Sequence, residues 1–206
     1  MFTLALDVDG VLLDSDRGGA GHWTNELTAR FGITRDEFRR AFFMTAWDDV
    51  VNGRRPIESA VAAALEVIGS TATVEDVLGC WFEADYVPFD AAIGFAQRAA
   101  ASATRVVLVT NQEHRRARFL TERLSAAFKL DGIVYSADVG AQKHEAKFFD
   151  VASERLGIPL DRRADVVFGD DTIDNVRQAR SSGWTAIHAD PGGAWIGEAE
   201  RVFGIS

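Results

Sequence analysis

The chain has 206 residues, 47% of them hydrophobic, and a net charge of −9 at pH 7. This length fits one large domain or a domain with an insertion, and the acidity argues against a nucleic-acid partner, which requires basic surfaces. The single cysteine excludes an internal disulfide and a cysteine-rich zinc site. No apolar run is long enough for a membrane span and no cleavable signal pattern is present, so we expect a cytoplasmic protein with no membrane partner. The composition leaves the oligomeric state open.

The first apolar run, residues 2–6, predicts a strand that is buried on both faces of a parallel sheet. Asp7 and Asp9 follow it directly, with Gly10 behind them. Two acids at the end of an apolar strand are costly unless a cation or a strongly polar group meets them. Because open α/β sheets bind ligands beyond the carboxyl ends of their strands, we place the candidate active site here. Taken alone, the pair could also be two loop acids that cap the next segment.

The region from residue 15 to residue 88 differs in character from the rest of the chain. Residues 15–21 are polar and glycine-rich and are interpreted as a hinge, and a second hinge is expected at Val87–Pro88. Between them the patterns are helical, with Thr34 and Glu37 in the positions of a capping box. The four predicted helices are Trp23 to Phe31, Thr34 to Phe43, Ile57 to Ile68 and Val74 to about Phe82.

Strand and helix patterns alternate from residue 89 onward. The predicted strands are 105–109, 133–135, 165–168 and 184–188, and the predicted helices are 91–103, 113–128, 144–156, 172–182 and 194–202. This alternation is typical of βαβ units in a parallel sheet. The expected fold is therefore α/β, a doubly wound parallel sheet formed by residues 1–14 and 89–206, with residues 15–88 inserted as an all-helical domain.

Polar side chains follow four of the predicted strands. They are Asp7 and Asp9, Thr110 and Asn111, Lys143 in the segment after Ser136, and Asp170 and Asp171. Parallel strands present their carboxyl ends on one edge, so we expect these groups to converge. Four carboxylates repel one another unless a cation joins them, and an all-oxygen set of ligands suits Mg²⁺.

These motifs, in this order, resemble the haloacid dehalogenase (HAD) superfamily, in its phosphatase branch with an α-helical cap inserted after the first strand. The resemblance covers essentially the whole chain and implies a Rossmann-type core. The matching stretches are Asp7-Val8-Asp9-Gly10-Val11, Val109-Thr110-Asn111-Gln112, Gly140-Ala141-Gln142-Lys143, and Phe168-Gly169-Asp170-Asp171-Thr172-Ile173-Asp174-Asn175.

The resemblance implies a two-step phosphoryl transfer. Asp7 would attack phosphorus and become an aspartyl phosphate, and Asp9 would serve as general acid and then as general base. Thr110, Asn111 and Lys143 would bind the phosphoryl group, with Lys143 also pairing with Asp7. Mg²⁺ would lie between Asp7, the backbone carbonyl of Asp9 and an acid of the fourth motif.

The implied function is Mg²⁺-dependent hydrolysis of a small phosphorylated substrate, a phosphate monoester. A phosphomutase could use the same residues. A 2-haloacid dehalogenase is disfavoured because that branch lacks the second acid, and a non-catalytic binding module is disfavoured because none of the core acids is missing.

Several assignments stay open at the level of sequence. Asp171 is preferred to Asp170 as the direct metal ligand, with Asp170 behind it. Lys143 is preferred to Lys147, which is interpreted as part of a solvated helix face.

The arginines are interpreted more simply. We interpret Arg115, Arg116 and Arg118 as a solvated helix face as well. Arg54 and Arg55, in a turn of the predicted cap, are candidates to meet a second anionic group of the substrate, although a solvated turn is the favoured interpretation.

Overall fold

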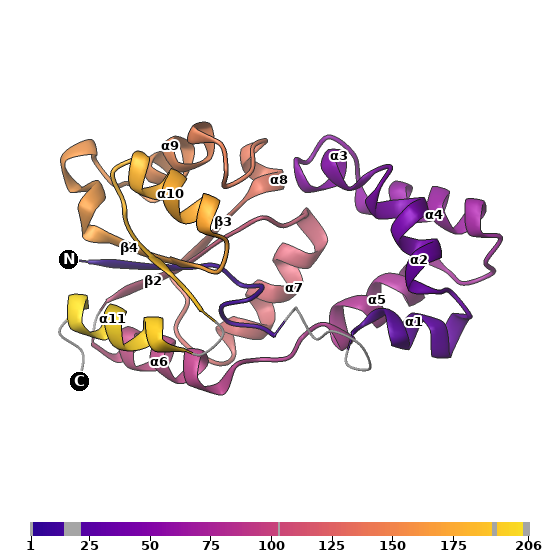
Figure 1. Ribbon diagram of the computed structural model, residues 1–206, viewed down its shortest axis with the longest axis horizontal. Helices are drawn as coiled ribbons and strands as arrows, with labels where there is room; N and C mark the ends of the chain where they lie inside the picture. The colour runs from indigo at the N-terminus through magenta and orange to yellow at the C-terminus, as the bar shows by residue number, and fades with distance from the viewer. Residues whose placement is uncertain (1, 15–21, 103, 191–192, 204–206) are drawn as a thin grey trace.

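The computed structural model describes residues 2–14, 22–102, 104–190 and 193–203. Within these residues, a sheet with its covering helices lies beside a separate group of helices (Figure 1). The sheet has five strands in the order β3-β2-β1-β4-β5, and every neighbouring pair is parallel. The strands are β1 (Thr3–Leu6), β2 (Arg105–Thr110), β3 (Gly132–Tyr135), β4 (Val166–Asp170) and β5 (Thr185–His188). The predicted doubly wound parallel sheet is confirmed.

The central strand β1 fixes the position of the first acid. All four of its residues are buried, as expected for an apolar strand with helices on both faces. Leu6 is in register with Leu108 on one side and with Gly169 on the other. The backbone amide of Asp7 then donates to the Gly169 carbonyl oxygen at 2.9 Å. Asp7 is thereby held beside the end of β4, where Asp170 follows.

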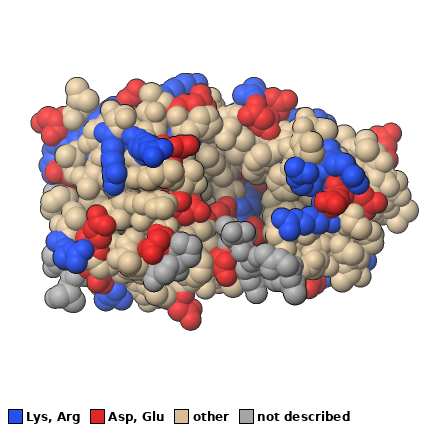
Figure 2. All heavy atoms as spheres, viewed as in Figure 1, with Lys and Arg blue, Asp and Glu red and all other residues tan. Residues whose placement is uncertain are grey.

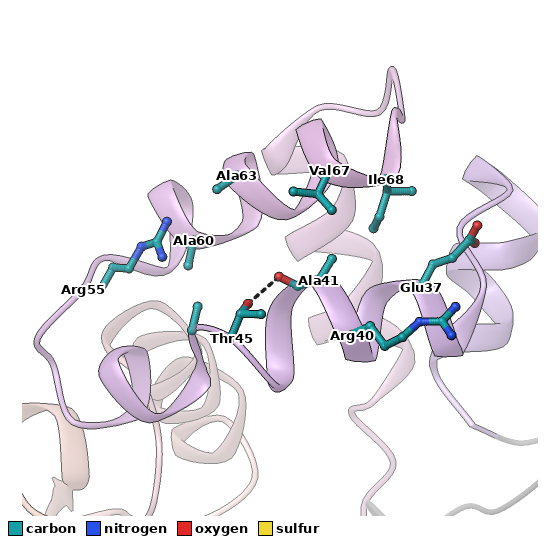
Figure 3. Close-up of a pocket in the computed structure, with 10 residues that line it drawn as sticks. Glu37, Arg40, Ala41, Thr45, Arg55, Ala60, Ala63, Val67 and Ile68 are labelled. Atoms are coloured by element: carbon teal, nitrogen blue, oxygen red, sulfur yellow. Dashed lines mark hydrogen bonds between the residues drawn. The ribbon is translucent and has the colours of Figure 1, made fainter.

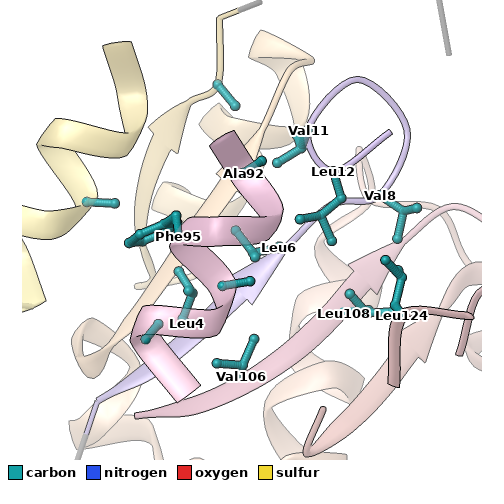
Figure 4. Close-up of a cluster of buried hydrophobic side chains, with 14 of the residues drawn as sticks. Leu4, Leu6, Val8, Val11, Leu12, Ala92, Phe95, Val106, Leu108 and Leu124 are labelled. Carbon is teal, nitrogen blue, oxygen red and sulfur yellow. The ribbon is translucent and has the colours of Figure 1, made fainter. Parts of the chain in front are cut away.

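Helices cover both faces of the sheet, and alternate residues of each strand face opposite layers. The helices of this part are α6 (Asp90–Ala101), α7 (His114–Ser125), α8 (Ser136–Val139), α9 (Ala146–Arg155), α10 (Ile173–Ser181) and α11 (Ala194–Phe203). Leu4 and Leu6 pack in one layer with α6, α7 and α11 (Figure 4). Ala5 and Phe168 pack in the opposite layer with α9 and α10. Each layer is a continuous buried cluster, so the strand ends are carried on a rigid scaffold.

The inserted helices have a hydrophobic cluster of their own. They are α1 (Thr24–Phe31), α2 (Arg35–Phe38), a π-helical turn (Arg39–Phe43), α3 (Trp47–Val51), α4 (Ile57–Ile68) and α5 (Val74–Ala84). Stacked and edge-on aromatic rings form its centre, among them Trp23, Phe38 and Trp81. The capping box of Thr34 and Glu37 is present. This separate cluster supports the division into a core and a cap at residues 14/15 and 88/89, which we keep as a proposal.

The two connections between these parts can be followed only in part. The predicted first hinge, residues 15–21, lies outside the described residues. At the second, the Asp14 amide donates to the Val87 carbonyl at 2.8 Å and the Phe89 amide donates to the Leu12 carbonyl at 2.9 Å. The return connection therefore lies against the loop that follows β1. Among the described helices, none combines the length and the apolar composition that crossing a membrane would require.

The cap also touches the core far from these connections, where α3 lies beside α8 (Figure 1). The Ser136 hydroxyl, at the start of α8, donates to the Val51 carbonyl at 2.6 Å. Gly53 has a φ of +71°, and a Cβ there would lie 2.2 Å from the Ala137 carbonyl oxygen. Only glycine allows this close approach of two backbones, so the turn after α3 is fitted to the core.

Candidate active site

The loop after β1 turns sharply and brings its acids against the end of β4. Val8 accepts hydrogen bonds from the amides of Leu12 and Leu13, which closes the turn. Gly10 has a φ of +78°, and a Cβ at this position would lie 2.1 Å from Oδ2 of Asp171. The glycine is therefore required both by the backbone conformation and by the carboxylate that packs on it.

Lys143 joins two of the predicted acids. Its side chain is 2% exposed, and Nζ lies 2.5 Å from Oδ2 of Asp7 and 2.7 Å from Oδ2 of Asp170. Burial lowers the pKa of this ammonium group, but Asp7 and Asp170 raise the pKa by more, so the net shift is upward. The backbone amide of Lys143 donates to Oδ1 of Asn111 at 3.0 Å. Buried Thr110 ends β2, directly before Asn111. The four predicted strand ends thus meet at one edge of the sheet.

Three carboxylates at this edge could hold a metal ion. Among the described residues, one oxygen each from Asp7, Asp170 and Asp171 lies within 4.8 Å of the others. Burial raises the pKa of Asp7 to about 8, an effect that Lys143 opposes and Asp170 strengthens. Burial and the Asp170 carboxylate also raise the pKa of Asp171. The negative charges here are under-compensated, and an oxygen-only set fits a hard divalent cation.

The two acids of the fourth motif differ in how far they are already engaged. Asp170 is fully buried and accepts from Nδ2 of Asn175 at 3.1 Å and from the Thr172 amide at 2.8 Å, in addition to Lys143. Asp171 is exposed as a residue, although its carboxylate packs on Gly10, and it accepts from the hydroxyl of Thr172 at 3.3 Å. This contrast supports Asp171 as the direct ligand, and the assignment remains a proposal.

Asp9 has a different set of partners from Asp7. Its Oδ1 accepts from Nη2 of Arg116 at 2.8 Å, and its Oδ2 accepts from Nη1 of Arg116 at 2.8 Å and from Nε2 of Gln112 at 2.6 Å. Nη2 of Arg116 also donates to Oδ2 of Asp85, at 2.7 Å. The loop therefore places Asp7 beside Lys143 and the carboxylate cluster, and Asp9 beside Arg116 and the side-chain amide of Gln112.

The sequence-based interpretation of Arg116 as a solvated residue is wrong, because its side chain is only 6% exposed. Burial lowers the pKa of this guanidinium, but Asp9 and Asp85 raise it more, and the net shift is upward. The signal that could have revealed Arg116 is its spacing from the buried Leu120 and Leu124, four and eight residues on, which puts all three on one helix face. Gln112 was also not singled out from the sequence.

Two other cationic residues follow the sequence-based expectations. Arg118 and Lys147 are exposed, as predicted for a solvated helix face. The same prediction is wrong for Arg115, because its side chain is only 25% exposed and donates to both carboxylate oxygens of Glu75 on the cap at 2.7 Å. Arg54 is half-exposed and forms ion pairs with Asp48 and Asp49 of its own segment, which supports a structural role.

A pocket lies on the cap, between the π-helical turn and α4, away from the strand-end residues (Figure 3). It has a volume of about 420 Å³ and is lined by Arg55 and by small apolar side chains such as Ala60 and Ala63. None of the strand-end residues lines it, so cavity size alone does not mark the acidic edge of the sheet. Figure 2 shows a separate recess between the core and the cap, with acidic and basic side chains in it.

Comparisons with known proteins agree with this geometry. The HAD family enzyme BT-2542 of Bacteroides thetaiotaomicron, in complex with magnesium and inorganic phosphate, superposes with a TM-score of 0.74 at 16% identity, covering 95% of this chain and 97% of that one. A HAD-like family hydrolase of Porphyromonas gingivalis gives 0.73 at 19%, covering 98% of each chain. An L-2-haloacid dehalogenase gives 0.66 at 17%, covering 93% of this chain and 85% of that one. At these identities the likeness concerns the fold.

The remaining comparisons concern sequence. A search of curated proteins gave no match. The family model for haloacid dehalogenase-like hydrolases, by contrast, matches residues 2–183. This match spans the loop after β1, the cap, and the strand ends that carry Lys143, Asp170 and Asp171. The protein therefore belongs to the haloacid dehalogenase-like hydrolases.

Proposed function

We propose that this protein is a Mg²⁺-dependent phosphatase that hydrolyses a small phosphate monoester through an aspartyl phosphate on Asp7. The observation that carries the proposal is the separation of the two acids of one loop. Asp7 contacts Lys143 beside a carboxylate cluster, whereas Asp9 is held outside that cluster by Arg116 and Gln112. A nucleophile and a general acid need such different surroundings.

The metal would be held by Asp7, Asp171 and the backbone carbonyl of Asp9, with Asp170 behind them. Bound Mg²⁺ would neutralise the charge of the transferred phosphoryl group. The solved complex of BT-2542 with magnesium and inorganic phosphate supports this choice of ion, since that enzyme shares the fold. The Asp7, Asp170 and Asp171 oxygens match the preference of Mg²⁺ for carboxylate ligands.

Each residue then has a defined task. A carboxylate oxygen of Asp7 attacks phosphorus and the bond to the alcohol oxygen breaks, while Asp9 gives its proton to that oxygen. Asp9 next takes a proton from water, which attacks the same phosphorus and releases inorganic phosphate from Asp7. Lys143 balances charge on the phosphoryl group, and the Thr110 hydroxyl and the backbone amide of Asn111 bind its oxygens.

The test is a panel of phosphate monoesters assayed with and without Mg²⁺, on the wild-type protein and on two variants. Asp7→Asn should abolish both turnover and labelling of the protein by phosphate. Asp9→Asn should slow alkyl phosphates by about 10²–10⁴-fold. It should slow aryl phosphates much less, because their leaving groups need little protonation. An Asp9→Asn protein that hydrolyses alkyl phosphates at the wild-type rate would refute the assignment.

A 2-haloacid dehalogenase is the second candidate, and the likeness to an L-2-haloacid dehalogenase favours it. Release of halide from a 2-haloacid without any metal would establish that activity instead. A phosphomutase would return the phosphoryl group to the substrate, which ³¹P NMR of the products would reveal, and a binding module would hold phosphate without turnover. The cytoplasmic location expected from the sequence stays a prediction, to be tested by cell fractionation.

A further inference from the structure

One buried guanidinium joins the loop after β1 to the last helix of the cap. Arg116 lies in the first turn of α7, and its two terminal nitrogens contact both carboxylate oxygens of Asp9. The same Nη2 atom contacts Asp85, the residue that ends α5. Arg116 and Asp85 are withdrawn from water, with side chains 6% and 9% exposed, and Asp9 is partly buried at 29%. A charge network this buried is strongly sensitive to the removal of any member.

The contact with Arg116 decides where the Asp9 carboxylate lies. Asp9 is only two residues from Asp7, so a cation bound at Asp7 and Asp171 would attract its carboxylate as well. A carboxylate bound to the metal could not serve the leaving group. The bidentate contact with Arg116, together with Gln112, holds the Asp9 side chain away from the carboxylate cluster. Arginine suits this task because its planar fork fixes the orientation of a carboxylate and not only its distance.

The contact with Asp85 makes this arrangement depend on the cap. Helix α5 also packs on α7 through other contacts. The centroids of the Phe82 and Phe119 rings lie 5.6 Å apart, and Arg123 forms an ion pair with Glu83. When the cap lies in this position, Asp85 and Asp9 share one guanidinium. Movement of α5 away from α7 would remove Asp85 from Arg116, so the support of Asp9 changes with the position of the cap.

We propose that Arg116 is the positioning residue for Asp9, and that through Asp85 it couples this positioning to docking of the cap. The proposal rests on the proposed function, because it assumes that Asp9 transfers the proton of the leaving group. Among the described residues, Arg116 itself contacts neither the predicted nucleophile nor the carboxylate cluster. Its effect on the reaction is exerted through Asp9.

The test compares an alkyl phosphate with an aryl phosphate on position 116 variants. Arg116→Met should lower kcat for the alkyl phosphate by about tenfold or more, which is part of what general acid catalysis contributes. For the aryl phosphate kcat should change by less than about threefold, because proton transfer matters little there. The double variant Asp9→Asn with Arg116→Met should be no slower on the alkyl ester than Asp9→Asn alone, because the two residues act as one unit.

Three further variants distinguish the positioning of Asp9 and its coupling to the cap from a general loss of folding. Arg116→Lys keeps the positive charge but lacks the fork, so it should show the same selective loss on the alkyl ester and serves if the methionine variant does not fold. Asp85→Asn should give a smaller loss of the same kind, together with faster amide hydrogen exchange over residues 82–89. Arg123→Met is the matched control, because it breaks an exposed ion pair between the same two helices, which contributes little to their docking, and leaves the contacts of Arg116 in place. It should leave the alkyl-to-aryl ratio of kcat unchanged.

The outcomes are distinguishable from those of the proposed function. A wild-type protein that hydrolyses no phosphate ester overturns both ideas. If the wild type is active and Asp9→Asn shows the selective loss, but the position 116 variants slow both esters equally or neither, only the positioning role of Arg116 is overturned. If Arg123→Met shifts the ratio as much as Asp85→Asn does, the specific coupling through Asp85 is overturned.

Discussion

Replacing Lys143 with methionine should destabilise the protein more than any exposed lysine change. Its ammonium group is buried between Asp7 and Asp170, at 2.5 and 2.7 Å. Removing one partner of a buried ion pair costs about 3–5 kcal/mol, because the remaining charge stays buried without compensation. Here Asp170 loses a partner but keeps its bonds from Asn175 and Thr172, and Asp7 can retain a proton, since burial raises its pKa to about 8. We therefore expect a loss within that range.

The assay is thermal unfolding in EDTA, followed by circular dichroism. For a chain of this size, 1 kcal/mol corresponds to about 2–4 °C in Tm. Lys143→Met should therefore lower Tm by about 6–20 °C. The matched control is Lys147→Met, which removes an exposed lysine that donates to the Gly140 carbonyl at 3.2 Å. It should change Tm by less than about 2 °C, as surface substitutions usually do. Equal losses in the two variants would refute the burial argument.

Three further predictions concern the same edge of the sheet. Asp171→Ala should weaken activation by Mg²⁺ more than Asp170→Ala does, and metal titrations showing the reverse order would make Asp170 the direct ligand. Gly10→Ala should destabilise the protein and weaken Mg²⁺ activation, because its Cβ would lie 2.1 Å from Asp171, whereas Gly69→Ala, with a similar φ of +74° and open space around it, should cost stability alone. In EDTA, Asp7 should make the free energy of unfolding fall as the pH rises from about 4 to about 8, by at most about 1.4 kcal/mol per pH unit. The reason is that burial raises the pKa of Asp7 from 3.8 to about 8, so the folded state retains a proton that the unfolded chain has released, and Asp7→Asn should remove this slope in urea unfolding.

The parallel sheet could be predicted because its strands are short apolar runs separated by helices, and such runs are stable only when buried on both faces. The shortest helices could not be predicted in this way. Helix α8 has four residues, too few to show a periodic apolar pattern. Its first residue, Ser136, bonds to the Val51 carbonyl of the cap. That contact joins parts of the chain 85 residues apart, so local sequence carries no signal for it.

Some residues of the candidate site could be predicted from the sequence and others could not. The convergence of Asp7, Lys143 and Asp170 could be expected, because each follows a predicted strand and parallel strands end on one edge. Arg116 could not be placed by that reasoning, since it lies within a helix and arginine is most often exposed. Its burial depends on the cap, because Asp85 supplies one of the two carboxylates that compensate the guanidinium. A sequence search for such residues must therefore look for charged side chains on the apolar face of a helix.

Two neighbouring acids on one short loop can act differently when different cations hold them, and the choice of cation matters. Lys143 is a compact charge that contacts Oδ2 of both Asp7 and Asp170, and it leaves their Oδ1 atoms to other donors, such as the amides of Val8 and Thr172. Arg116 instead engages both oxygens of Asp9, which fixes the orientation of that side chain. An arginine at the first position would compete with a metal ion for the oxygens of Asp7. A lysine at the second would leave Asp9 able to rotate toward the cluster. In the proposed mechanism, this pairing of each acid with its own cation type allows a nucleophile and a proton donor to stand two residues apart.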